Sequence, residues 1–208
     1  GDLVDDIVVW LNGPIQHATD SDAAVYRTRG GSAANVAAFA ARTHPTRFLG
    51  CVGADAIGDW LVDDLTRDGV EVQVQRREST GTVVVLVDEH GERTMFPHRG
   101  AATMLSDIPE SWTRDLRHLH VPAYSFSGGP IADTSRTLVR RMLADQATVS
   151  VDASSTGLLR TFGTARFLAL LSELRVPLLL ANRAEATYLG LIEGHQPGPS
   201  LADIPHTW

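Results

Sequence analysis

The sequence predicts an α/β protein: a three-layer α/β/α sandwich with a mostly parallel sheet and a small antiparallel β lid. Beyond Gly100, strand-like runs alternate with helical runs long enough to cross back over a parallel sheet. Between residues 70 and 97, three strand-like runs follow one another without a helix, as in an inserted antiparallel patch. At 208 residues, the chain is long enough to bury about 70% of its unfolded surface as a single domain, 1–208.

Composition excludes several classes of protein. Hydrophobic residues make up 43% of the chain and charged residues 21%, as in globular rather than disordered or fibrous proteins. No run approaches the ~18 apolar residues of a membrane span, and the first residues do not resemble a secretion signal. We therefore expect a cytoplasmic protein with no membrane partner. The net charge of -7, without a basic run, argues against a nucleic-acid partner.

The sequence contains no lysine, and all 18 of its cationic side chains are arginine. This excludes Schiff-base catalysis and a Walker-type phosphate lysine, so phosphate chemistry has to use backbone N–H groups, arginine or a metal ion. The single cysteine, Cys51, lies in the apolar run 48–52 and is expected to be a small buried side chain.

The N-terminal half is expected to begin with a β-loop-α-β arrangement. Its first strand-like segment, Leu3–Val9, begins abruptly, and a glycine pair leads into an alanine-rich helix. A second helix ends at Gly69, which can adopt the left-handed C-cap conformation. The expected elements are a helix over Ala33–Arg42, a strand over Phe48–Val52 and a helix over Asp55–Asp68.

Three strand-like runs then form the expected lid: Val70–Val74, Thr82–Val87 and Arg93–Phe96. Residues 88–91 suit a hairpin turn between the last two runs. An antiparallel patch of this kind often covers a site, although a plain extension of the sheet fits the pattern about as well. We place the lid strands at approximately 7–29 and 70–97.

The C-terminal half is expected to continue the parallel sheet. Its elements are strands over Leu116–Val121, Thr148–Val151 and Val176–Ala181, with helices over Ile131–Leu143 and Leu158–Leu174. The stretch from Gly194 to Trp208 is rich in proline and glycine and is expected to hold no further element. Because ligands bind beyond the carboxyl ends of such strands, we look for a site in the loops after Val9, Val52, Val121, Val151 and Ala181.

The segment Gly30–Asn35 is the first candidate for a binding loop. Gly30 and Gly31 let the backbone approach a ligand, and the helix behind them offers free N–H groups and a partial positive charge. Asn35 adds a hydrogen-bond donor and an acceptor. A tight strand-to-helix turn explains a glycine pair equally well and, for the pair alone, is the favoured interpretation.

Carboxylates supply two further candidates. Asp5 and Asp6 are placed at the end of the first strand, one on each face, and composition alone favours an exposed, solvated pair. Asn182 and Glu185 follow the last apolar strand with the spacing of a helix capping box. The same spacing sets an amide and a carboxylate at a strand end, where a hydrated magnesium ion could use them, and the two interpretations weigh equally.

The histidines do not indicate a metal site. They are scattered over positions 17, 44, 90, 98, 118, 120, 195 and 206, without zinc-like spacing. His118 and His120 alternate in an expected strand and therefore face a common surface. Residues 125–129 lack the G-x-S-x-G pattern, which argues against a serine hydrolase.

Several segments, in this order, resemble the ribokinase or PfkB-type carbohydrate kinase family over residues 1 to about 190. Residues 1–6 are similar to its first strand, and Asp6 falls on its substrate-contacting aspartate. Gly30–Asn35 resembles its N-terminal signature, and residues 52–58 and 80–101 resemble its next turn and its lid. Asn182-Arg183-Ala184-Glu185 is similar to the N-x-x-E motif that helps organise magnesium and phosphate in the family.

The resemblance implies a ribokinase-like fold and ATP-dependent, Mg²⁺-assisted phosphorylation of a hydroxyl of a small sugar, nucleoside or related alcohol. It implies substrate contacts by Asp6, Gly30, Gly31 and Asn35, with Arg99 and Tyr124 as further candidates. It implies a magnesium and phosphate region at Asn182 and Glu185, with Glu185 acting through water. A homodimer through the lid strands is a further family expectation.

The family's general base is an aspartate in a late Gly-Ala-Gly-Asp motif, which this sequence does not contain. We therefore assign no catalytic residue and expect a domain truncated at its nucleotide-binding part. The alternative is a non-catalytic ligand-binding or interaction protein with a kinase-like fold.

Overall fold

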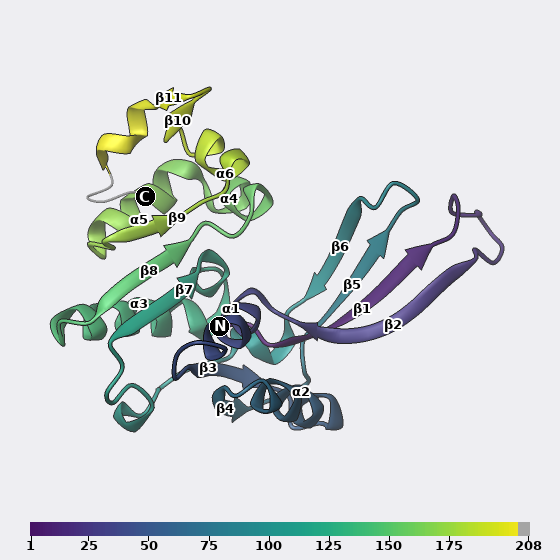
Figure 1. Cartoon of the computed structure of the whole chain (residues 1–208), viewed down its shortest axis with the longest axis horizontal. Coiled ribbons are helices and arrows are strands. Elements are labelled where there is room, and N and C mark those ends of the chain that lie inside the picture. The colour runs from purple at the N-terminus through teal and green to yellow at the C-terminus, as the bar shows by residue number, and fades with distance from the viewer. Residues whose placement is uncertain (204–208) are drawn as a thin grey trace. The chain divides into compact units, whose positions relative to one another are not determined.

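The computed structural model describes residues 1–203 and has two compact units, Gly1–Leu105 and Ser106 onward. Both units are α/β, and most of the larger strand pairings are parallel, with helices between the strands (Figure 1). The predicted α/β fold class with a small antiparallel part is confirmed. Among the described residues, no helix combines the length and apolar character required to cross a membrane.

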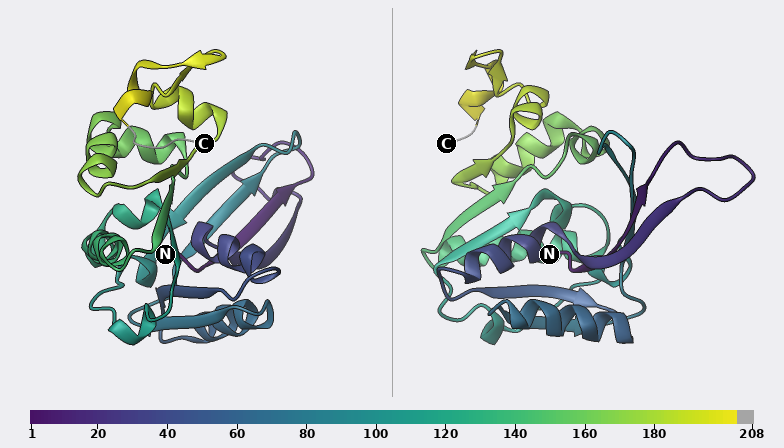
Figure 2. Two further views of the ribbon diagram at one scale, coloured as in Figure 1. Left: turned by 60° about the vertical axis from the view of Figure 1, so that its left-hand side comes forward. Right: turned by 45° about the vertical axis from the view of Figure 1, so that its right-hand side comes forward.

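The first unit contains a four-stranded sheet in the order β2-β1-β5-β6, which we call the lid sheet after the lid that the sequence predicts there. Its strands are β1 (Val4–Leu11), β2 (Ala23–Gly30), β5 (Thr82–Val87) and β6 (Arg93–His98). The pair β1/β5 is parallel, whereas β1/β2 and β5/β6 are antiparallel. Figure 2 shows β1 and β2 as a long curved ribbon.

The rest of the first unit is a β3–α2–β4 crossover together with α1 (Ser32–Ala41) and a 3₁₀ turn at Gly100–Thr103. Strands β3 (Arg47–Val52) and β4 (Glu71–Arg76) form a separate parallel pair, linked by α2 (Ala56–Arg67). The four-stranded sheet therefore contains only part of the range 70–97. The reason is that the α2 crossover returns the chain parallel to β3, which a sequence-adjacent hairpin cannot do.

Helix α2 shows why these residues fold as they do. Asp55 caps its first turn by accepting a hydrogen bond from the Gly58 N–H at 2.8 Å. Leu61 and Leu65, one turn apart, are completely buried and pack in one core cluster with residues of α1 and β3. Gly69 then takes φ 85°, which ends the helix.

The second unit has a three-stranded parallel sheet in the order β7-β8-β9. Its strands are β7 (His118–Pro122), β8 (Thr148–Asp152) and β9 (Leu178–Leu180). Its helices are α3 (Gly129–Ala144), α4 (Thr156–Phe162), α5 (Thr164–Glu173) and α6 (Arg183–Tyr188), with 3₁₀ turns at Glu110–Trp112 and Ala123–Phe126. The core of this unit includes Val149, Val151 and Phe167, all at most 1% exposed.

Two predictions for the second unit are wrong. The single helix over Leu158–Leu174 is two helices, because Gly163 adopts φ 88° and ends α4. The stretch after Gly194 holds structure: β10 (Ile192–Glu193) pairs with β11 (Gln196–Pro197), and a 3₁₀ turn covers Pro199–Asp203. Close approach of Gly198 to the Gly190 carbonyl folds this segment back on itself. The remainder of that stretch, including His206, lies outside the described residues.

Candidate functional site

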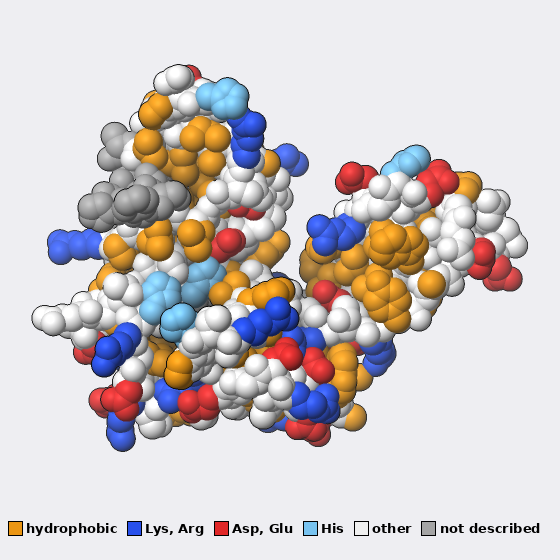
Figure 3. Space-filling model, in the orientation of Figure 1, with side chains coloured by type: hydrophobic (Ala, Val, Ile, Leu, Met, Phe, Trp, Pro, Cys, Tyr) orange, Lys and Arg blue, Asp and Glu red, His pale blue; other side chains and the backbone are white. Residues whose placement is uncertain are grey.

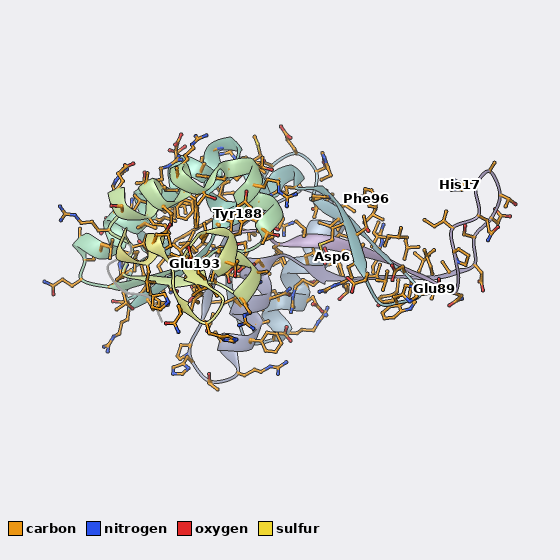
Figure 4. The ribbon with its side chains drawn as sticks, turned by 90° about the horizontal axis from the view of Figure 1, so that it is seen from above. Asp6, His17, Glu89, Phe96, Tyr188 and Glu193 are labelled. Carbon is orange, nitrogen blue, oxygen red and sulfur yellow. The ribbon has the colours of Figure 1, made fainter. Side chains whose placement is uncertain are left out.

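The carboxylate of Asp6 lies against the backbone of Gly30 at the base of the lid sheet. A Cβ atom added to Gly30 would stand 2.0 Å from Asp6 Oδ1 and 2.2 Å from Cγ. Asp6 is the third residue of β1 rather than at the end of the strand, because the strand runs on to Leu11. Figure 4 shows Asp6 well away from His17 and Glu89, which mark the far loops of the lid.

Partial burial raises the pKa of Asp6 from its usual 3.8 to about 6, and the neighbouring Asp5 carboxylate adds to the effect. A raised pKa means that the folded chain disfavours the charged form of Asp6. Hydrogen-bond donors placed beside this carboxylate would stabilise the charge.

Asp5 has a different environment. It is only 1% exposed, and its Oδ1 has no hydrogen-bond partner. Burial raises the pKa of Asp5, and Arg27, whose Nη1 lies 3.7 Å from Oδ2, offsets part of this shift. The expectation of two exposed, solvated carboxylates is wrong, because Asp5 is buried and Asp6 is partly buried where β1 pairs with β2 and β5.

The predicted binding loop is also a structurally required turn. Gly31 has φ 105°, and a Cβ atom there would lie 2.2 Å from the Asp2 carbonyl oxygen, so a side chain does not fit. The Asp2 carbonyl accepts a hydrogen bond from the Ala34 N–H at 3.3 Å. The side chain of Asn35, in the first turn of α1, is exposed to solvent.

A connection between Asp55 and Thr80 was not predicted as part of the site. The Thr80 N–H donates to Asp55 Oδ2 at 2.8 Å, and the Thr80 hydroxyl donates to Oδ1 at 2.6 Å. Burial works to raise the pKa of Asp55, but the hydrogen bonds from Thr80 and Gly58 outweigh it and hold the pKa below its usual value. The pattern Asp55-x-x-Gly58 signals the helix cap, but no local signal points to Thr80.

Arg99, a predicted substrate contact, forms a two-pronged ion pair with Asp2. Arg99 Nε donates to Asp2 Oδ2 and Nη2 donates to Oδ1, both at 2.8 Å. The side chains are 18% and 12% exposed, so the pair is largely removed from water. Because the two residues are 97 positions apart, no local sequence pattern predicts this contact.

In the second unit, a hydrogen-bond network joins the loops that follow β7 and β8. The Tyr124 hydroxyl donates to Ser155 Oγ at 3.0 Å, and the Ala123 N–H donates to Ser154 Oγ at 2.9 Å. Ser154 holds φ 70°, and its N–H donates to Asp152 Oδ1 at 2.5 Å. The network holds Tyr124, which the sequence analysis names as a candidate substrate contact. The hydrogen bonds of Ser154 in this network were not predicted.

Asn182 and Glu185 form the capping box that their spacing predicts. The Glu185 N–H donates to Asn182 Oδ1 at 3.0 Å, and the Asn182 N–H donates to Glu185 Oε2 at 2.9 Å. The Asn182 side-chain amide donates to Glu185 Oε1 at 2.8 Å, so both carboxylate oxygens accept hydrogen bonds. Glu185 is 4% exposed.

His118 and His120 share a surface, as predicted. His118 Nε2 and His120 Nδ1 each lie 2.9 Å from Ser150 Oγ on the neighbouring strand. Burial lowers the pKa of both histidines. Within residues 1–203, no three His, Cys, Asp or Glu side chains are grouped so that they could hold a metal ion.

Comparison with known proteins identifies one family. The family model described as "pfkB family carbohydrate kinase" matches residues 9–189. Among curated proteins, fructokinase of Klebsiella pneumoniae is 31% identical over 137 residues, which is 61% of this chain and 44% of that protein. Fructokinase of Salmonella typhimurium is 29% identical over 154 residues, 69% of this chain and 50% of that protein. The chain thus spans about half the length of these relatives.

Solved structures agree in fold. A fructokinase from Xylella fastidiosa is 26% identical, with a TM-score of 0.76 over 91% of this chain and 62% of that one. The adenosine kinase from Sinorhizobium meliloti is 24% identical, with a TM-score of 0.80 over 93% of this chain and 66% of that one. The second likeness supports the ribokinase-like fold alone.

Proposed function

Because the chain belongs to the pfkB family of carbohydrate kinases, we propose that it carries the sugar-binding and lid part of an enzyme that phosphorylates a small sugar or nucleoside. The phosphoryl donor is ATP, and the acceptor is a hydroxyl group of the substrate. The observation that carries the proposal is the placement of the Asp6 carboxylate on the bare backbone of Gly30, at the base of a lid sheet.

Asp6 accepts hydrogen bonds from substrate hydroxyls in this proposal. A carboxylate offers two acceptor oxygens and can hold two neighbouring hydroxyls of a sugar at once. Gly30 keeps the space beside it free of a side chain, and Asn35 adds exposed donors and acceptors at the start of α1. Because the pKa of Asp6 is about 6, the carboxylate is mostly charged at neutral pH.

ATP as the donor is supported by the Xylella fastidiosa fructokinase solved with bound ATP, which is 26% identical with a TM-score of 0.75. Magnesium, when bound, neutralises charge on the transferring phosphoryl group. Each Glu185 oxygen accepts one hydrogen bond from Asn182 and keeps a lone pair, which fits contact with a hydrated ion through water rather than direct coordination. We assign no general base to this chain.

A homodimer through the lid sheet is the assembly that we propose. Apolar side chains gather over the lid (Figure 3), and several large ones are more than two fifths exposed. By strand alternation, Trp10, Tyr26 and Met95 lie on one face of the sheet, and Val25 and Phe96 lie on the other. A second lid packed on the face of Val25 and Phe96 removes the apolar surface of that face from water. Analytical ultracentrifugation of the chain and of a Phe96→Glu variant tests the proposal, since the variant is expected to be monomeric.

The kinase proposal is tested with the longest available reading frame that includes this chain. ATP-dependent phosphorylation is measured on D-fructose and D-ribose, after which the fructokinase relatives and a ribokinase of Schizosaccharomyces pombe are named, and on adenosine, a nucleoside of the class that the sequence analysis expects. We expect turnover of at least one of them, and loss of about 10- to 100-fold in kcat/KM with Asp6→Asn, which removes a charged acceptor at nearly constant volume.

Asp20→Asn is the matched control, because Asp20 is an exposed carboxylate in the β1–β2 loop, away from Gly30. No turnover of any sugar or nucleoside, together with unchanged sugar binding by Asp6→Asn, would contradict the proposal.

A further inference from the structure

The ion pair between Asp2 and Arg99 joins two of the four chain segments that connect the lid sheet to the rest of its unit, the one before β1 and the one after β6. Asp2 lies two residues before β1, and Arg99 directly follows β6. In the sheet order β2-β1-β5-β6, β5 separates these two strands, so no backbone ladder connects them. The ion pair is therefore a direct link between the residues that precede β1 and the residues that follow β6.

The backbone of each partner is packed against a glycine loop. The Asp2 carbonyl accepts a hydrogen bond from Ala34 in α1 and leaves no space for a side chain on Gly31. The Arg99 carbonyl likewise leaves no space for a side chain on Gly81, since a Cβ atom there would lie 2.2 Å from it. The Gly81 carbonyl in turn accepts a hydrogen bond from the Asp5 N–H at 2.9 Å, next to Asp6.

These contacts form two branches that both start at Arg99. One branch runs through Asp2 to Gly31 and the start of α1, and the other runs through Gly81 to Asp5 in β1, next to Asp6. The two-pronged geometry fixes the direction of both side chains, which a single hydrogen bond does not. Because the pair is largely buried, removing either partner takes away a charge-assisted contact that water replaces only in part.

We infer that Asp2 and Arg99 are positioning residues, which hold the Gly30–Asn35 loop against the Asp6 carboxylate without contacting substrate themselves. This inference rests on the proposed sugar-binding function and gives Arg99 a different part from the one that the sequence suggests. A lid clamped at its base in this way presents the Asp6 acceptors in one arrangement before substrate arrives, which lowers the entropy lost on binding.

The inference is tested by comparing Asp2→Asn, Arg99→Gln and the double variant with the parent chain. Hydrogen exchange of residues 31–41 reports on the loop and α1 whether or not a sugar binds. We expect about tenfold faster exchange in both single variants, and no further increase in the double variant, because either change breaks the same branch. Arg99→Lys keeps the charge but not the two-pronged geometry and should fall between the parent chain and Arg99→Gln.

Arg67→Gln is the matched control, since Arg67 belongs to an exposed ion pair with Asp64 in the same unit and should leave exchange unchanged. Calorimetric titration with D-fructose, D-ribose and adenosine adds the functional arm. Equal loss of affinity in Asp2→Asn and Arg99→Gln supports the inference.

Loss confined to Arg99→Gln identifies Arg99 as a substrate ligand and overturns the inference, as does unchanged exchange in both single variants. Absence of binding by the parent chain counts against the proposed function and leaves the exchange result to decide on the positioning role.

Discussion

Gly30→Ala adds one methyl group at the point where the sugar site is proposed. The new carbon would stand 2.0 Å from Asp6 Oδ1 and 2.4 Å from Oδ2, far inside contact distance. The obstructing atoms are the end of a side chain, so Asp6 can rotate away while the backbone of β1 stays paired. The change therefore displaces a carboxylate rather than the fold.

The expected magnitudes follow from that geometry. Inserting a methyl group into a packed site costs about 1–3 kcal/mol, and rotation of Asp6 keeps the loss of unfolding free energy near the lower bound. Sugar binding suffers more, because a hydrogen bond to a charged group contributes about 1.5–3 kcal/mol, or roughly 10- to 150-fold in affinity. Binding and stability thus respond unequally to the same substitution.

Calorimetric titration with sugar and urea unfolding measure the two effects on one preparation. Gly13→Ala is the matched control, since Gly13 lies in the β1–β2 loop with no atom within 4 Å of an added Cβ. Gly30→Ala with the sugar affinity of the parent chain would refute the assignment of Asp6 as the hydroxyl acceptor beside Gly30. A global loss of folding would refute the argument that the side chain yields.

Further predictions concern pH, the α2 cap and a strained loop. Because folding raises the pKa of Asp6, the contribution of this group to the stability of the fold is fully present below about pH 4. That contribution is lost as the pH rises through about 6. It amounts to at most about 3 kcal/mol before solvent screening. Sugar affinity should rise over the same interval in titrations at several pH values, and Asp6→Asn should abolish the dependence. Asp55→Ala removes the cap and the acceptors of Thr80 and should lower the urea unfolding free energy by about 2–4 kcal/mol, whereas a loss below 1 kcal/mol contradicts the connection. Ser154→Ala loses the hydroxyl that accepts from the Ala123 N–H and keeps the strained φ, whereas Ser154→Gly loses the same hydroxyl and relieves the strain. The unfolding free energy of Ser154→Gly in urea should therefore exceed that of Ser154→Ala by about 1 kcal/mol. The reverse order would contradict this prediction.

Local patterns predict those parts of the fold that local physics decides. The periodicity of α2, with Asp55 before it and Gly69 after it, predicts Asp55–Asp68, and the helix spans Ala56–Arg67. The capping box at Asn182 is equally local, because both partners lie within one turn. Strand alternation places Asp5 and Asp6 on opposite faces but does not reveal which face is covered.

Non-local contacts decide the rest. Strand β4 follows α2 and precedes β5 in sequence, yet it pairs with β3, because a helical crossover favours a parallel neighbour. Gly163 lies within the run that the sequence predicts as one helix, but its backbone conformation divides that helix. The Asp2–Arg99 and Asp55–Thr80 connections form only when distant segments of the chain meet, so the periodicity of the sequence does not predict them.

Titration of the parent chain and of Asp6→Asn with D-fructose, D-ribose and adenosine at pH 7.5 is the most direct test of the sugar site proposed at Asp6 and Gly30. We expect the parent chain to bind at least one of these compounds and Asp6→Asn to weaken that binding by about tenfold or more. Binding of equal strength by the two chains would contradict the placement of the sugar site at Asp6 and Gly30.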